Sequence, residues 1–256
     1  MQATRPQARE QSVGHNRTGV KASPMDGRKL ESITSDAPPP ESLQATRMRE
    51  EYTRRADQFG SVPLVATAKG VAEMALQALQ GHRLASFIDR LGERLAFERS
   101  GVRAYQAVLV KIEALGTWQG GPTRDLLQEQ LDEELRHFHM LKRTLERLGA
   151  DPTAMTPSAD VAAVEASGVF KVLADPRTSL SQALHALLVL EDVDADGWDM
   201  LVEIAANNNQ KDLASEFRNA LASEETHKAR VRGWLGKAVI ADAQRKSDRQ
   251  SGAAMH

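Results

Sequence analysis

Glutamates and histidines recur at fixed spacing along this chain, inside patterns that otherwise carry apolar residues. The set, in chain order, is Glu98, Glu134, His137, Glu191, Glu224 and His227. It comprises two single glutamates and two copies of a Glu-x-x-His motif. Residues three apart lie on one face of a helix, so each motif can offer both side chains to one centre. Imidazole and carboxylate together suit iron, manganese or zinc, whereas calcium and magnesium prefer oxygen ligands alone.

Each of these glutamates interrupts a stripe of apolar residues spaced by three and four. Around Glu98, for example, the stripe includes Leu91, Leu95 and Val102. This spacing is typical of the inward face of a bundle helix. A buried carboxylate is costly unless a cation or a hydrogen-bond donor offsets it. The pattern therefore predicts that the glutamates bind metal inside a bundle.

Charge counting predicts two metal ions, because four glutamates match the charge of two divalent cations. The motif glutamates, Glu134 and Glu224, are expected to bridge the ions, and each motif histidine to bind one ion. The two single glutamates, Glu98 and Glu191, are expected to cap one ion each. The residues leave iron and manganese open as alternatives.

Three further side chains fall near the predicted ligands. Tyr105 lies two turns after Glu98, so it is either a redox-active or hydrogen-bonding group beside the metals or part of the core. Trp198 stands in the same relation to Glu191 and is expected to pack. Asp194, three residues after Glu191, can add a third carboxylate, although the acidic run around it is otherwise typical of a solvated face.

Other ionisable neighbours are expected to face away from the metals. Glu133 and Glu225 adjoin the motif glutamates but project from a different side of the helix. His139 is expected on the surface, and His185 lies off the direct line to the predicted ligands.

The helical patterns predict an all-α fold, a four-helix bundle over residues 83–240. Glycines and a proline at 116–123 predict a short turn between the first two helices, and three asparagines at 207–209 separate the last two. The middle connection, at about 150–178, is much longer and is expected to hold a short helix near 162–173. One long crossover is the connection of ferritin-like bundles.

The segments outside the bundle lack its apolar pattern. Residues 1–60 are predicted to form a disordered arm, residues 61–82 a short amphipathic helix (about 67–80) with a linker, and residues 241–256 a flexible tail. The first thirty residues are locally basic. They are interpreted as a solvated tail, with contact to an acidic surface or nucleic acid as the alternative.

Composition excludes several classes of protein. The hydrophobic fraction of 41% supports a core in this 256-residue chain, and a net charge of −2 gives no general attraction to nucleic acid or membrane. The absence of cysteine excludes disulfides and thiolate-held iron. No stretch is long and apolar enough to span a bilayer, and the charged first thirty residues lack the apolar core of a secretory signal. A cytoplasmic location is expected.

These features make the chain similar to the ferritin-like superfamily of ferritins, bacterioferritins and rubrerythrins. The resemblance covers about residues 88–235 and rests on the six glutamates and histidines in their order. It implies a carboxylate-bridged di-iron centre that reacts with oxygen or peroxide, and Tyr105 matches a tyrosine of that family. Two Glu-x-x-His motifs look more like bacterioferritin or rubrerythrin than ferritin. The lack of cysteine rules out the cysteine-rich iron domain of many rubrerythrins.

Four functional hypotheses follow from the sequence. The first is a di-iron oxidase, either a ferroxidase or a peroxidase-like enzyme. The second is a metal-binding or storage module without turnover, which for storage requires a homo-oligomer. The third is a structural bundle that binds no metal. The fourth is a DNA-protecting particle that uses the basic arm.

Overall fold

The structure, a computed structural model, describes residues 25, 28, 40–57, 59–62 and 81–253 of the chain. It divides into two units, residues 10–59 and a larger unit that contains residues 60–256. In the described part all regular secondary structure is helical, so the predicted all-α class is confirmed.

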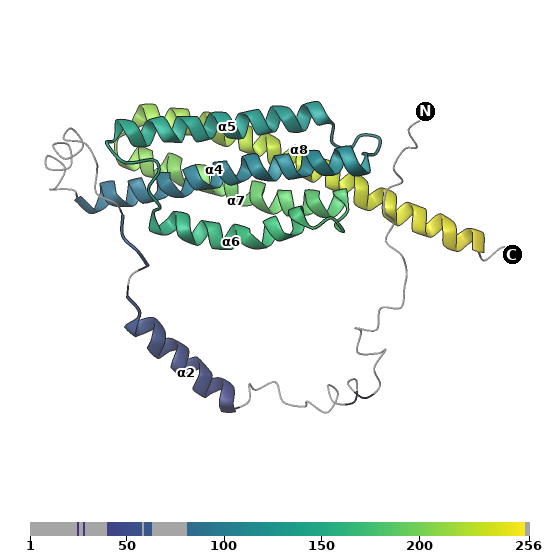
Figure 1. Ribbon diagram of the computed structural model, residues 1–256, viewed down its shortest axis with the longest axis horizontal. Coiled ribbons are helices and arrows are strands. Elements are labelled where there is room, and N and C mark those ends of the chain that lie inside the picture. The colour runs from purple at the N-terminus through teal and green to yellow at the C-terminus, as the bar shows by residue number, and fades with distance from the viewer. Residues whose placement is uncertain (1–24, 26–27, 29–39, 58, 63–80, 254–256) are drawn as a thin grey trace. The chain divides into compact units, whose positions relative to one another are not determined.

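Four long helices form the bundle of the larger unit, and a shorter helix lies alongside them (Figure 1). The helices are α4 (Gly81–Leu115), α5 (Arg124–Arg147), α6 (Pro157–Ala174), α7 (Leu180–Asn207) and α8 (Lys211–Ala253). Neighbours in sequence pack together, α4 with α5 and α7 with α8, and α6 packs on α4 and α7. Because α6 sits in the connection between α5 and α7, the predicted four-helix bundle with one long crossover is confirmed. This is the connection of ferritin-like bundles.

Polar residues at the predicted turns end and begin the helices. Thr123 caps α5 by accepting a hydrogen bond from the Leu126 backbone N–H at 3.3 Å. Ser179 and Gln182 form a capping box at the start of α7. Between α7 and α8, Asn209 adopts a φ of 57°, a left-handed conformation that asparagine tolerates better than most residues. The short turns keep each helix pair antiparallel.

The bundle core consists of two apolar clusters on either side of a polar layer. On α5, Leu131 belongs to one cluster and Leu141 to the other, and Glu134 and His137 lie between them in sequence. Apolar side chains therefore enclose the polar layer on both sides along the bundle axis.

Of the described helices, none is long and apolar enough to cross a membrane.

The ends of the chain differ in part from the prediction. Residues 40–55 form the helix α2 (Pro40–Arg55), although they fall within the predicted disordered arm. Proline suits the first turn of a helix, and Arg55 pairs with Glu51 one turn away at 2.6 Å. The predicted flexible tail also differs, because α8 continues to Ala253. The amphipathic helix expected at about 67–80 lies outside the described residues.

Candidate metal centre

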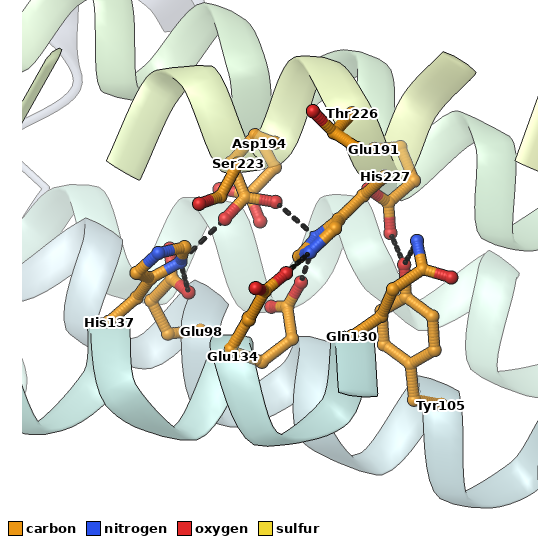
Figure 2. A network of polar contacts seen from close by, with 12 residues as sticks. Glu98, Tyr105, Gln130, Glu134, His137, Glu191, Asp194, Ser223, Thr226 and His227 are labelled. Atoms are coloured by element: carbon orange, nitrogen blue, oxygen red, sulfur yellow. Dashed lines mark hydrogen bonds and ion pairs between the residues drawn. The ribbon is translucent and has the colours of Figure 1, made fainter. Parts of the chain in front are cut away.

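Seven predicted site residues from four helices meet in the polar layer of the bundle (Figure 2). They are Glu98 from α4, Glu134 and His137 from α5, Glu191 and Asp194 from α7, and Glu224 and His227 from α8. None is more than 8% exposed. The apolar stripes that carry these residues turn them inward, so residues up to 129 positions apart share one site, as Glu98 and His227 do.

Their ligand atoms form overlapping groups in which all atoms lie within 4.8 Å of one another. The groups are Glu98 with His137 and Glu224; Glu134 with Glu191, Glu224 and His227; and Glu98 with Glu134 and Asp194. Glu224 belongs to both groups that contain a histidine. Glu134 is grouped with Glu191 and also with Glu98. Both motif glutamates thus lie between the two single glutamates, where the sequence predicts bridging ligands.

Several buried ligand atoms in this cluster have no hydrogen-bond donor. They are Glu98 Oε2, Glu134 Oε2 and Glu191 Oε2. Glu134 Oε1 lies 3.3 Å from His227 Nδ1, and Glu224 Oε1 forms an ion pair with His137 Nδ1 at 2.6 Å. Buried polar groups in proteins are nearly always paired, and an unpaired one costs about 1–3 kcal/mol. The concentration of unpaired acceptors at one point in the core fits a site for cations.

Burial and mutual repulsion shift the carboxyl groups toward the protonated form. Burial and the charges of Glu224 and Glu98 raise the pKa of Glu134 well above its ordinary value. Burial and Glu224 likewise raise the pKa of Glu191 to about 8. Several carboxylates this close cannot all ionise without positive charge nearby.

The two histidines respond in the opposite direction. Burial lowers the pKa of His137, but contacts with Glu224 and Glu98 outweigh it and raise that pKa to about 10. His227 behaves in the same way, its pKa raised to about 9 chiefly by Glu224, whose Oε2 lies 2.9 Å from its Nδ1. The two imidazoles in turn lower the pKa of Glu224 to about 2 despite its burial. In the metal-free protein, protons on the histidines therefore balance part of the carboxylate charge.

Two aromatic residues each hold one oxygen of a single glutamate. Trp198 Nε1 donates to Glu98 Oε1 at 2.8 Å, and the Tyr105 hydroxyl donates to Glu191 Oε1 at 2.6 Å. Gln130 donates to the Tyr105 oxygen at 3.1 Å. The two hydrogen bonds are reciprocal: the tyrosine of α4 donates to the glutamate of α7, and the tryptophan of α7 donates to the glutamate of α4. The second oxygen of each glutamate is left unpaired.

The expectation that Trp198 only packs is therefore incomplete. Its ring packs against Phe217, and it also lies edge-on to His137 with ring centroids 5.4 Å apart. The indole N–H must find an acceptor when it is buried, and Glu98 supplies one. The seven-residue spacing of Trp198 from Glu191, equal to that of Tyr105 from Glu98, is the sequence signal for this role.

Glu133 was expected to face away, and this expectation is wrong. Its Oε2 lies 2.6 Å from His227 Nε2, the ring nitrogen that does not face Glu224. The Glu133 side chain leaves α5 in a different direction from Glu134 and contacts the His227 ring from the side opposite to Glu224. Carboxylates in this position commonly orient metal-binding histidines. Glu225 and His139 are exposed and face away, as expected, and His185, which was expected to lie off the direct line to the ligands, is exposed as well.

The most consequential residue that the sequence analysis missed is Arg94, which is 1% exposed. Its guanidinium donates to Asp194 Oδ1 at 2.6 Å and to the Asp194 carbonyl at 3.1 Å, and it lies over the Phe97 ring. Gly197 makes room for this group, because a Cβ there would overlap it. Arg94 lies one turn before Glu98 on the inward stripe, and this position was the available signal. The carboxylate expected as an additional ligand, Asp194, is thus balanced by a buried arginine.

Gly101 makes similar room for Glu134, since a Cβ at this position would overlap the Glu134 carboxylate. We expect Gly101→Ala to destabilise the protein by about 1–3 kcal/mol, as overpacking does in cores. Gly168→Ala is the control, because Gly168 is an exposed helix residue with open space around it. That change is expected to stabilise by up to about 1 kcal/mol. Urea unfolding measures both, and equal effects of the two changes would contradict the close approach at Gly101.

Comparison of the sequence with protein families and with curated proteins found no match. A comparison with solved structures found a crystal structure described as that of ferritin-like, diiron-carboxylate proteins from Bacillus anthracis str. Ames. It is 18% identical, with a TM-score of 0.46, and the match covers 60% of this chain and 98% of that chain. The helix order and the single long crossover define the bundle independently of this likeness.

Proposed function

We propose that this protein binds two iron ions in the centre of its bundle and oxidises ferrous iron with oxygen or peroxide. Manganese is the alternative metal. The observation that carries the proposal is the cluster of buried ligand atoms, several of them without a hydrogen bond, in which the two groups that contain a histidine share Glu224. Because Arg94 balances Asp194, the four glutamates remain to match two divalent cations.

The ligand groups indicate which residues would hold each ion. Glu98 and His137 would serve one ion and Glu191 and His227 the other, with the motif glutamates between them. Bound iron would supply one-electron redox chemistry, which protein side chains of this kind lack. This ligand set is the one used by di-iron and di-manganese carboxylate bundles.

The surrounding residues would hold the ligands in place and exclude water. Trp198 and Tyr105 fix one oxygen of each single glutamate, and the other oxygen would be available to hold an ion. Burial and the charge of Glu191 raise the pKa of Tyr105 well above its ordinary value, so its hydroxyl keeps a proton beside that carboxylate. We assign Tyr105 as the residue that holds a proton next to the reacting centre. The two apolar clusters limit access of water along the bundle.

The test is an anaerobic titration with ferrous iron, followed by addition of oxygen and measurement of ferric absorbance in the near ultraviolet. The wild type is expected to bind two irons per chain and to develop the band. Glu134→Ala should lose both, because it removes a central ligand. Glu225→Ala is the matched control, since this exposed glutamate adjoins the second motif without facing the site.

Each outcome of this titration has a distinct meaning. Binding of two irons without oxidation would favour a metal-binding module over an oxidase. Absence of saturable binding, or identical traces from wild type and Glu134→Ala, would contradict the metal centre itself.

A further inference from the structure

A groove lies between α5 and α8, the neighbouring bundle helices that contact each other least. Its volume is about 840 Å³, and its walls include residues 136–147 of α5 and 216–223 of α8. Binding sites for small molecules have volumes of about 300–1,000 Å³. The groove is thus large enough for an organic molecule rather than for an ion or water alone.

The groove reaches one end of the candidate metal centre. His137 lines it, and the His137 side chain is 10% exposed, whereas those of the other six site residues are 0–4% exposed. The opposite end of the cluster is closed by Tyr105 and Gln130, both buried (Figure 2). A molecule in the groove would therefore lie next to the most accessible of the predicted ligands.

Arginines dominate the charged lining of this groove. Arg136, Arg143 and Arg147 line it from α5, spaced so that they share one side of the helix. Arg143 is exposed and has no ion pair among the described residues. A guanidinium binds carboxylate or phosphate through two parallel hydrogen bonds and repels metal cations. The lining therefore favours binding of an anion over binding of a ferrous ion.

The acidic residues of the lining do not cancel this preference. Glu146 is paired with Lys142, which lies outside the groove lining. Glu216 lies 3.5 Å from Arg147, a long contact that both partners can leave. Arg136 also contacts Glu133, at 3.1 Å. Arg143 is left as the cation that no acidic side chain balances.

Two apolar side chains line the same groove, Met140 of α5 and Ala220 of α8. Ala220 is buried and Met140 partly buried. An anion with an apolar chain would satisfy both parts of the lining, whereas inorganic phosphate would use only the arginines. We propose that this groove binds an organic carboxylate, with its head group at Arg143 and its apolar chain over Met140 and Ala220, beside His137. The proposed head-group contact is with Arg143 rather than with a metal ligand, so binding does not require bound iron.

The test is calorimetric titration of the metal-free full chain with sodium octanoate. We expect one saturable site per chain, and affinity at least tenfold lower for acetate, because a buried methylene contributes about 0.8 kcal/mol. Arg143→Gln should weaken octanoate binding by about tenfold or more, since hydrogen bonds to charged groups are among the stronger ones. The control is Arg99→Gln, an exposed arginine on α4 that does not line the groove and should leave binding unchanged.

A second variant tests the location without removing charge. Asn219→Trp adds bulk at an exposed position in the groove wall and should prevent binding. Absence of saturable binding to the wild type, or wild-type affinity in both Arg143→Gln and Asn219→Trp, would overturn the proposal. Equal affinity for octanoate and acetate would contradict the binding of an apolar chain in the groove. Equal affinity for octanoate and octan-1-ol would contradict the binding of a carboxylate at Arg143. Iron titration of Arg143→Gln should match the wild type, so failure of the metal centre is recognised independently.

Discussion

Saturating the metal-free protein with ferrous iron or Mn²⁺, without oxygen, is expected to raise its free energy of unfolding by about 5 kcal/mol. A ligand at one hundred times its Kd stabilises by about 2.7 kcal/mol per site, and the bundle offers two overlapping sites. For a chain of this size, that gain raises the Tm by about 10–20 °C. Thermal unfolding followed by circular dichroism, with and without metal, measures it.

The reason for so large an effect is the state of the ligands when no metal is bound. Glu134 is buried without a hydrogen bond to either oxygen, and burial together with the neighbouring carboxylates raises its pKa well above the ordinary value. In Glu134→Gln an amide can donate to those carboxylates. That variant should therefore be more stable than the wild type without metal, by about 1 kcal/mol or more, and should lose most of the gain on adding metal.

Glu225→Gln is the control for this comparison, because its side chain is exposed and should change neither value. An unchanged Tm of the wild type in the presence of either metal would contradict the proposed centre. So would an equal metal-induced rise in wild type and Glu134→Gln. Loss of stability in Glu134→Gln without metal would show instead that the carboxylate is satisfied in the metal-free core.

The features of the site that the sequence predicted correctly are those determined by the residue pattern within a single helix. Apolar periodicity fixes which face of each helix points inward, so Glu98, Glu134, Glu191 and Glu224 could be placed in the core from spacing alone. The short turns and the long crossover followed from glycine, proline and asparagine at the helix ends. These signals are local, and the described bundle agrees with them.

The parts that sequence analysis missed depend on the rotation and register of two helices together. Arg94 and Asp194 are 100 residues apart, and Glu133 and His227 are 94 apart. No periodicity in either helix specifies that such partners meet. The hydrogen bond from Trp198 to Glu98 belongs to the same class, although its mirror relation to Tyr105 offered a signal. Outside the bundle, α2 is a helix without an apolar stripe, so apolar periodicity could not predict it.

The Arg94–Asp194 pair leads to the second large expected effect. Replacing Arg94 by methionine should destabilise the protein by about 3–5 kcal/mol, because it leaves a buried carboxylate beside Glu98 and Glu134 without its cation. Burial and the charge of Glu98 already raise the pKa of Asp194 well above its usual range, and Arg94 opposes that shift. Urea unfolding of the metal-free protein gives the difference directly.

Two further variants separate the charge from the packing of this arginine. Arg94→Met combined with Asp194→Asn should recover most of the lost stability, because removing both charges avoids the unpaired carboxylate. Arg90→Met, one turn earlier, removes a half-exposed partner of Glu93 and should cost no more than about 1 kcal/mol. If the double variant is as unstable as Arg94→Met alone, then the loss comes from packing over Phe97 rather than from the charge. If the double variant recovers its stability, then the charge of Arg94 is what Asp194 requires. Arg94 would then neutralise Asp194, and only the four glutamates would remain for metal ions to balance.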